Sequence, residues 1–313
     1  MIKYLLGPLC LLATALISHG QDGDSARYRD IIFSEVNIIK DLSYARQVPN
    51  GVKKEYYSYD LYQSFGDSVR KGRPLIIWMH GGGFKYESKD AAGMQLWCSS
   101  FAKRGYVCAA INYRLTKKNT LFKFKALVSG CADGVEDARQ AIRYFKDNAK
   151  KFRIDTNHII LAGNSAGAMI ALQAAYSTPA ELAKLAEDST LNLKEPDPGK
   201  IACVINFWGA MFDIDWLKNA KVPIVSVHGR NDNTVPVTQK GSNFYGSLPI
   251  HKEADTLHIP NKLKIYNGYS HELERVFTPF YASRAAKQRW LEAGQFAADF
   301  LYETLFKSTA GSF

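Results

Sequence analysis

Ser165 stands at the centre of the run GNSAG, residues 163–167, where a β-branched apolar run gives way to a helix-compatible one. A serine hydroxyl is a poor nucleophile until a neighbouring base takes its proton, and it must protrude from the backbone to reach a carbonyl carbon. A sharp strand-to-helix turn gives that exposure, and small flanking residues leave the room that the turn needs. The following helix also points its free N–H groups at the reacting centre. We therefore predict that Ser165 is a nucleophile.

A second run, HGGGF at residues 80–84, has the composition of an anion-stabilising loop. Consecutive glycines after an apolar strand allow close backbone approach, and their N–H groups can stabilise the charged oxygen of a tetrahedral intermediate. We expect the backbone N–H groups of Gly82, Gly83 and Ala166 to be these donors. A phosphate-binding loop is disfavoured, because no Lys-Ser or Lys-Thr pair follows the glycines. His80 is expected to brace the loop by hydrogen bonding.

The base that activates a serine is most simply a histidine, and His271 is the best placed in the sequence. It follows the last predicted strand, as expected of a side chain at the active edge of a parallel sheet. His228 also ends a strand, but it precedes the expected acid in the same turn. The other histidines after residue 20 belong to the glycine loop, to the start of a strand or to a long loop: His80, His158, His251 and His258.

Asp232 is the expected acid, because it lies in the run HGRNDNTVP directly after the penultimate predicted strand. Its role would be to orient the imidazole and to stabilise the imidazolium that forms when the serine loses its proton. Asp213 and Asp215, which follow the preceding strand, are the fallback. Glu272, beside the predicted base, is expected to be a surface charge.

The elements that must position these residues alternate along the chain. Short, nearly continuous apolar runs are typical of parallel strands covered on both faces, and they occupy residues 73–80, 106–115, 158–163, 201–210, 222–229 and 262–268. Helical patterns lie between them, most clearly at residues 134–152 and 285–305. Two alternating segments on either side of residues 49–51, Pro-Asn-Gly, predict a leading antiparallel pair. The pattern predicts a single α/β domain over residues 21–313, with a mostly parallel twisted sheet and helices on both faces.

Residues 1–20 have the pattern of a cleavable secretory signal peptide: Lys3, then an apolar run, then small residues before a polar segment. The apolar run is too short for a membrane span. We therefore expect an exported protein, periplasmic or extracellular, that is not stably inserted in a membrane. An uncleaved anchor is the alternative.

Four cysteines follow this leader, and they allow three different pairings into two disulfides. Cys108 and Cys203 lie within predicted buried strands, where cysteine packs as a small hydrophobe. We expect any bridge to join Cys98 to Cys131. The sequence has no Cys-x-x-Cys motif and no cluster of His and Cys, so neither a metal nor another cofactor is expected.

The sequence leaves the role of three further features open. The basic run KKNTLFKFK, residues 117–125, is either a solvated loop or a cavity mouth that attracts anionic or acidic-polysaccharide material. No nucleic-acid motif accompanies it, so nucleic acid is not expected as a partner. Residues 177–200 are either a small cap over the site or a surface segment that does not contact the ligand. Among the aromatic residues near strand ends, Phe84 and Trp208 are expected in the substrate pocket.

With HGGGF, GNSAG, HGRNDNTVP and GYSHE in this order, the sequence from about residue 36 onward resembles the α/β-hydrolase superfamily. The resemblance is to its carboxylesterase branch, which includes hormone-sensitive-lipase-like and bacterial feruloyl-esterase-like enzymes. It implies a catalytic triad and an oxyanion hole at residues already named: Ser165, Asp232 and His271 for the triad, and Gly82, Gly83 and Ala166 for the hole.

Two positions depart from the hormone-sensitive-lipase-like pattern: Asn164 stands where that pattern has an acidic residue, and Ala168 where it has a second glycine. These departures and the expected export favour esterases that act on plant or other environmental polymers. The expected function is a secreted serine carboxylesterase that hydrolyses small or polymer-linked esters through an acyl-enzyme. The alternatives are a feruloyl or acetyl esterase acting on polysaccharide, a peptidase of the prolyl-oligopeptidase type, and a catalytically inactive binding module. The charged 177–200 segment argues against a lipase lid.

Overall fold

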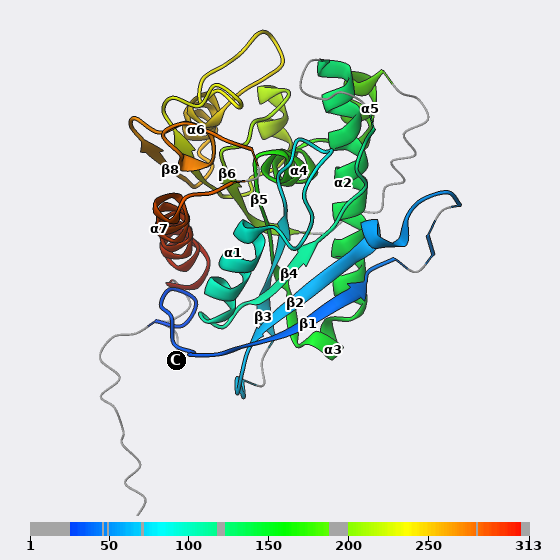
Figure 1. Ribbon diagram of the computed structural model, residues 1–313, viewed down its shortest axis with the longest axis vertical. Helices are drawn as coiled ribbons and strands as arrows, with labels where there is room; N and C mark the ends of the chain where they lie inside the picture. Colours follow the sequence, from blue (N-terminus) through cyan, green and yellow to red (C-terminus); the bar gives the residue numbers. More distant parts are fainter. Residues whose placement is uncertain are drawn as a thin grey trace, which may run out of the picture.

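In the part of the chain that the structure describes, eight strands form one twisted sheet (Figure 1). That part of the computed structural model comprises residues 26–45, 47–48, 50–69, 72–117, 123–187, 200–279 and 281–307. The strands are β1 Val36–Ser43, β2 Ser58–Ser64, β3 Arg73–Met79, β4 Val107–Ile111, β5 Ile154–Asn164, β6 Ile201–Phe207, β7 Ile224–Gly229 and β8 Asn261–Tyr266. Their order across the sheet is β1-β2-β4-β3-β5-β6-β7-β8. The expected signal peptide, residues 1–20, lies outside the described residues.

Strand directions follow the prediction. β1 pairs antiparallel with β2, which pairs antiparallel with β4. From β4 through β3 and β5 to β8, every pairing is parallel. The leading antiparallel pair and the mostly parallel sheet are thus confirmed. Because parallel strands end at the same edge, the loops that follow β3, β5, β7 and β8 meet there, and these loops carry the predicted site residues.

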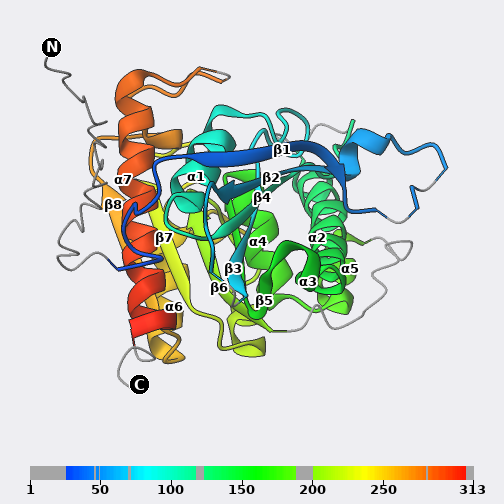
Figure 2. The ribbon, with the colours of Figure 1, turned by 90° about the horizontal axis from the view of Figure 1, so that it is seen from below.

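Helices cover both faces of the sheet. They are α1 Ala92–Ala102, α2 Phe124–Asp147, α3 Ala149–Phe152, α4 Ala166–Tyr176, α5 Pro179–Ala186, α6 Ser247–Thr256 and α7 Arg284–Leu301, with short 3-10 segments at Lys54–Tyr57, Ile214–Asn219 and His271–Leu273 and a π turn at Tyr302–Phe306. α1 and α7 lie side by side on one face (Figures 1 and 2). α2 and α4 cover the other face.

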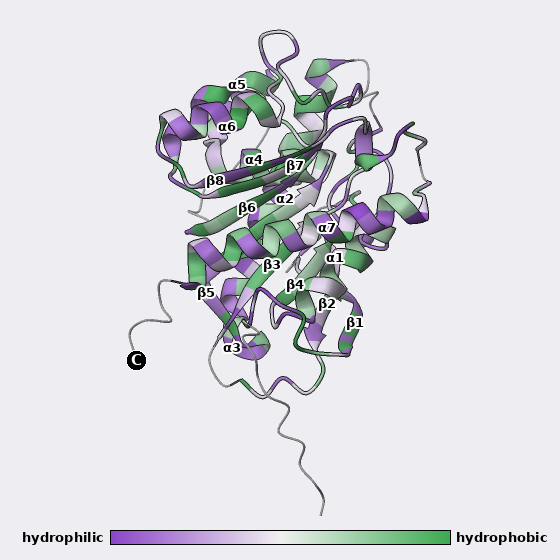
Figure 3. Cartoon of the chain, turned by 90° about the vertical axis from the view of Figure 1, so that its left-hand side faces the viewer, coloured by the Kyte–Doolittle hydropathy of each residue, from purple (hydrophilic) through white to green (hydrophobic). Residues whose placement is uncertain are grey.

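The alternation of side chains along the strands builds a core on each face. On β3, Leu75, Ile77 and Met79 pack with α2 and α4, whereas Ile76 and Trp78 pack with α1 and α7. Strands buried on both faces should be apolar throughout. Figure 3 shows this, because the strands in the middle of the sheet are coloured mainly as hydrophobic.

These two faces explain why the expected disulfide is absent. Cys98 lies on α1 and Cys131 on α2, so the sheet separates the two thiols. A disulfide requires the two Cα atoms to lie within about 7 Å. All four cysteines after residue 20 are buried free thiols: Cys98, Cys108, Cys131 and Cys203. The expectation of a bridge between Cys98 and Cys131 is therefore wrong.

The structure describes part of each of two segments whose role the sequence leaves open, residues 117–125 and 177–200. α2 begins at Phe124 rather than at residue 134, so the end of the basic run forms its first turn. Of residues 177–200, those from 188 to 199 lie outside the described residues. The described part forms α5, which begins with a capping box between Thr178 and Glu181 and packs against α2. Of the helices described, none combines the length and apolar character that a membrane span requires.

Candidate active site

The structure brings Ser165, His271 and Asp232 together in one hydrogen-bonded chain. Nε2 of His271 lies 3.0 Å from Oγ of Ser165, and Nδ1 of His271 lies 2.7 Å from Oδ2 of Asp232. The three residues follow β5, β8 and β7, respectively, and all are buried. Because the carboxylate accepts the Nδ1 proton, Nε2 is left with a lone pair that can accept the proton of the serine.

The turn at Ser165 is strained and tightly packed. Ser165 has a φ of +51° and a ψ of −118°, a conformation that residues other than glycine rarely adopt. A Cβ at Gly163 would lie 2.3 Å from the carbonyl carbon of Gly167, and a Cβ at Gly167 would lie 2.0 Å from the carbonyl oxygen of Met79. Close backbone approach therefore requires both glycines. The Ser165 N–H donates to the carbonyl of Phe207 on β6 at 2.9 Å, which holds the turn in place.

A buried carboxylate needs several hydrogen-bond donors to stay charged, and Asp232 has them. Its Oδ1 accepts the backbone N–H groups of Thr234 at 2.9 Å and Val235 at 2.8 Å. Burial by itself would raise the pKa of Asp232, but the His228 and His271 imidazoles hold that pKa below its usual value by hydrogen bonding and by their charge. The carboxylate is therefore an anion at neutral pH and can orient His271.

Gly82 and Gly83 line the same cavity as Ser165, Ala166 and His271. Both glycines have positive φ, +82° and +61°, and a Cβ at Gly82 would lie 2.2 Å from a backbone oxygen. Ala166 is the first residue of α4, so its N–H has no acceptor within the helix. The three residues predicted as oxyanion donors thus border one cavity together with the serine.

His80 and Tyr113 brace the glycine loop. The Tyr113 hydroxyl lies 2.8 Å from the carbonyl oxygen of His80 and 3.0 Å from that of Gly81. The His80 ring stacks on Tyr113 with centroids 4.3 Å apart, and its Nδ1–H donates to the Gly81 carbonyl at 3.1 Å. Burial lowers the pKa of His80 to about 4, so this imidazole is neutral. His80 holds the loop as expected, whereas the sequence offered no signal for Tyr113.

The cavity beside the serine has a volume of about 800 Å³, and Phe84 lines it as predicted. Trp208 does not line it, because its ring packs against Trp97 and Trp290 with centroids 5.9 Å and 6.3 Å away. Trp208 has a φ of +43°, so the strand alternation breaks after Phe207 and both rings face α1 and α7. The pocket prediction for Trp208 is therefore wrong. Other apolar side chains of the lining include Phe124, Leu127, Met169, Phe244 and Phe277.

Two carboxyl groups also line the cavity, and neither was expected there. Glu87 follows the glycine loop, and Glu272 directly follows His271. The backbone of Glu272 has a φ of +55°, and its carbonyl accepts the indole N–H of Trp290 at 2.7 Å. Burial raises the pKa of Glu272 to about 7 and also raises that of Glu87. The expectation that Glu272 is a surface charge is therefore wrong.

The fallback acids have structural roles instead. The Asp213 carboxylate accepts the N–H of Asp215 at 3.0 Å and so caps the 3-10 segment Ile214–Asn219. Asp215 forms an ion pair with Lys218. Neither aspartate lines the cavity, and neither does any residue of the described part of the 177–200 segment.

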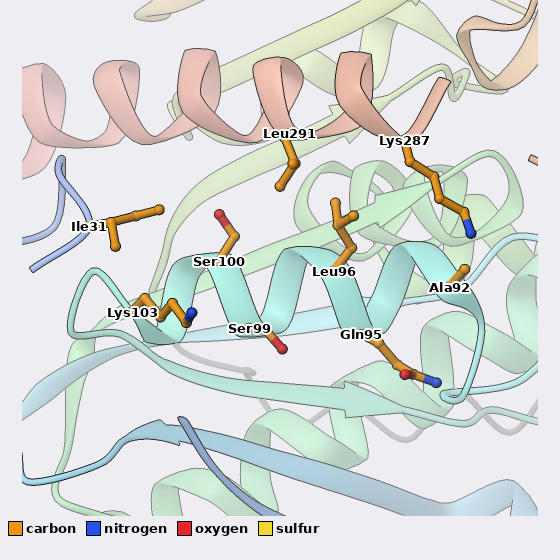
Figure 4. A pocket seen from close by; sticks show the side chains of 9 residues that line it. All are labelled: Ile31, Ala92, Gln95, Leu96, Ser99, Ser100, Lys103, Lys287 and Leu291. Carbon is orange, nitrogen blue, oxygen red and sulfur yellow. The ribbon is translucent and has the colours of Figure 1, made fainter. Parts of the chain in front are cut away.

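A second hollow lies between α1 and α7 (Figure 4). It has a volume of about 510 Å³ and is lined by Ile31, Ala92, Gln95, Leu96, Ser99, Ser100, Lys103, Lys287 and Leu291. None of the predicted site residues borders it, so it is not the candidate active site. Within the described residues, no three His, Cys, Asp or Glu side chains are grouped as a metal site would require.

Comparison with known sequences finds esterases that match part of the chain. The family model described as BD-FAE matches residues 60–215, which contain the glycine loop and Ser165. Venom carboxylesterase-6 of Apis mellifera is 35% identical over 111 residues, which are 34% of this chain and 19% of that protein. Gut esterase 1 of Caenorhabditis elegans is 32% identical over 95 residues, 30% of this chain and 17% of that protein. The chain thus spans less than a fifth of the length of these curated relatives.

Solved structures share the fold over most of the chain. A thermophilic esterase from the Planctomycetes species Thermogutta terrifontis is 21% identical, with a TM-score of 0.60 over 87% of this chain and 95% of that chain. A truncated carbohydrate esterase from gut microbiota is 16% identical, with a TM-score of 0.55 over 85% of this chain and 98% of that chain. At these identities the likeness concerns the fold. It agrees with the α/β-hydrolase fold that the sequence predicts, and the family match over residues 60–215 is to esterases.

Proposed function

We propose that this protein is a serine carboxylesterase that works through an acyl-enzyme. The observation that carries the proposal is the hydrogen-bonded chain from Oγ of Ser165 through His271 to Asp232, beside a cavity of about 800 Å³. A cavity of this size suits a small-molecule ester or the end of a larger one. The names of the similar esterases support the same reaction class.

In the acylation step, Oγ of Ser165 attacks the ester carbonyl carbon while Nε2 of His271 takes the hydroxyl proton. The anionic Asp232 stabilises the imidazolium that results. The carbon–oxygen bond of the ester then breaks, and His271 returns the proton to the leaving alcohol. The products of this step are the free alcohol and an acyl ester on Ser165.

In the deacylation step, His271 takes a proton from a water molecule as that water attacks the acyl carbon. Collapse of the second tetrahedral intermediate releases the carboxylic acid, and the serine regains its proton from His271. In both steps the backbone N–H groups of Gly82, Gly83 and Ala166 stabilise the oxyanion, because they are held in place before the charge develops.

An esterase that removes feruloyl or acetyl groups from polysaccharide is the second candidate, with the same chemistry and a narrower substrate. Two partly exposed aromatic rings at the cavity favour it: Tyr86 is 45% exposed and Phe124 is 39% exposed. Flat apolar rings beside a reaction site can stack on the apolar face of a sugar or on an aryl acid.

We also propose that the protein is exported. The support is the signal-peptide pattern of residues 1–20 in the sequence. Mass spectrometry of the protein recovered from the periplasm or the medium of an expressing bacterium should find a chain that begins near residue 21. A full-length chain retained in the cells would contradict export.

The esterase proposal is tested by covalent labelling and by a substrate panel. A fluorophosphonate probe should label the wild-type protein and fail to label Ser165→Ala, because the probe reacts only with an activated serine. Wild-type protein should hydrolyse 4-nitrophenyl acetate, with acetylated xylan and a dipeptide amide assayed alongside. Equal labelling of both proteins would overturn the assignment of Ser165. Cleavage of the dipeptide amide alone would overturn the reaction class.

A further inference from the structure

Three lysines from three separate segments line the cavity beside Ser165. Lys85 directly follows the glycine loop, Lys123 immediately precedes α2, and Lys240 lies in the long loop after β7. Lys123 and Lys240 are exposed, and Lys85 is half-buried. Within the described residues, none of the three forms an ion pair, and the only side-chain contact found is that of Lys85 with the ring of Tyr86. Their positive charges are therefore available to a ligand.

Two nearby lysines, Lys125 and Lys89, are each paired with a carboxylate. Lys125, two residues after Lys123, pairs with Glu187 at 2.8 Å and does not line the cavity. Lys89, four residues after Lys85, is buried and pairs with Asp60 at 2.8 Å. Lys85 and Lys123, which line the cavity, thus have no ion pair, whereas their neighbours Lys89 and Lys125, which lie outside it, are paired.

The negative charges of the cavity lie near the catalytic base instead. Glu87 and Glu272 both interact electrostatically with His271, and burial raises the pKa of each. Since the pKa of Glu272 is about 7, part of this negative charge is absent at neutral pH. The carboxyl groups therefore only partly offset the three lysines of the lining.

We propose that Lys85, Lys123 and Lys240 bind the carboxylate of an acidic saccharide whose ester group is placed at Ser165. Lysine suits this task, because an ammonium on a flexible stem can follow a carboxylate whose position varies along a polymer. The exposed rings of Tyr86 and Phe124, beside Lys85 and Lys123 in the sequence, offer flat surfaces for the sugar. This inference rests on the proposed esterase function and narrows its substrate to esters of uronate-containing saccharides.

The kinetic test compares two substrates that differ by one charge: an acetyl ester of glucuronic acid and the same ester of glucuronamide. Exposed charge pairs are each worth a few-fold at most, so three lysines should favour the acid by about tenfold in kcat/KM, mainly through KM. The triple variant Lys85→Gln/Lys123→Gln/Lys240→Gln should bring this ratio close to one. The control Lys125→Gln should keep the wild-type ratio, and added salt should lower that ratio only where the three lysines are present.

Each outcome separates this inference from the esterase proposal. A wild-type ratio near one, or a ratio that the triple variant preserves, would overturn the inference and leave the esterase intact. Should the triple variant unfold, Lys123→Gln and Lys240→Gln are measured singly, and each should lower the ratio about twofold. If the wild-type protein hydrolyses no ester, the esterase proposal fails, and saccharide binding then tests the inference about the three lysines. In that case trigalacturonic acid should bind about tenfold more tightly than maltotriose to wild-type protein, and equal binding of both would reject the inference.

Discussion

Nε2 of His228 lies 3.4 Å from Oδ2 of Asp232, so the carboxylate that holds His271 also faces a second imidazole. His228 is buried, and it is fixed from both sides. Its Nε2–H donates to the carbonyl of Val235 at 2.8 Å, and its Nδ1 accepts the hydroxyl of Ser247 at 2.8 Å. A carboxylate with a fixed neighbour on each side has little freedom to rotate away from His271.

His228→Phe should slow the reaction without weakening substrate binding. The change removes both hydrogen bonds of the imidazole and its interaction with Asp232, so the carboxylate can shift and the base becomes misaligned. We expect kcat to fall by about ten- to a hundredfold with little change in KM, because small misplacements of catalytic groups cost this much. His158→Gln, which alters a partly exposed pair with Asp155, serves as the control. A rise in KM with an unchanged kcat would contradict the positioning role of His228.

Ser165→Gly should stabilise the fold while it abolishes ester hydrolysis. Ser165 has a φ of +51°, and the strain of such a conformation costs about 1–3 kcal/mol in a residue with a Cβ. Glycine removes that strain, but it also gives the unfolded chain more conformational freedom. The free energy of unfolding of Ser165→Gly should therefore exceed that of Ser165→Ala by about 1 kcal/mol. Denaturant unfolding of the two variants measures the difference. Equal stability of the two would show that the turn carries no strain.

Glu272→Gln should stabilise the protein at alkaline pH and leave its stability unchanged in acid. Burial raises the pKa of Glu272 from 4.5 to about 7, so the folded protein binds this proton more tightly than the unfolded chain does. The resulting stabilisation is present below about pH 4.5 and is lost as the pH rises through about 7. Glutamine stays neutral, so the melting temperature of the variant should exceed that of the wild type at pH 8 and match it at pH 4.5.

Glu35→Gln is the matched control for this comparison, because Glu35 is exposed. Its substitution should leave the pH dependence of the melting temperature as in the wild type. A constant offset between Glu272→Gln and the wild type at all pH values would contradict titration of Glu272 as the cause.

All four thiols of the chain from residue 21 onward should be free and hidden. Cys98, Cys108, Cys131 and Cys203 are buried, and burial raises the pKa of each thiol, which suppresses the reactive thiolate. Ellman's reagent should therefore detect no thiol in the native protein and four after denaturation without reductant. A count of two after denaturation would show a disulfide. Reductant should leave the melting temperature unchanged.

Much of the fold followed from local patterns. Continuous apolar runs marked the parallel strands, and the Pro-Asn-Gly turn at residues 49–51 marked the antiparallel pair, because both are properties of neighbouring residues. The start of α2 could not be placed in this way. Residues 124–133 have few charges and only a weak periodic pattern, and they become helical where the helix packs against α4 and α5.

The prediction of a disulfide between Cys98 and Cys131 was wrong for a different reason. Spacing along the chain carries no information about which face of a sheet a helix will cover, and Cys98 and Cys131 lie on helices that cover opposite faces. Tyr113 was missed for the same kind of reason: its contacts with His80 and Gly81 join residues that are more than thirty positions apart.

The sequence by itself determined which edge of the sheet carries the polar residues, because strand ends and turn residues are read from local pattern. It therefore placed Ser165, Asp232 and His271 at one edge before any contact was known. Only the tertiary structure decided where the side chains beside them point. Trp208 turns into the core and Glu272 turns into the cavity, each through a positive φ at a residue other than glycine. Such a φ depends on distant contacts, as the hydrogen bond from the Trp290 indole to the Glu272 carbonyl illustrates, and no local pattern encodes it.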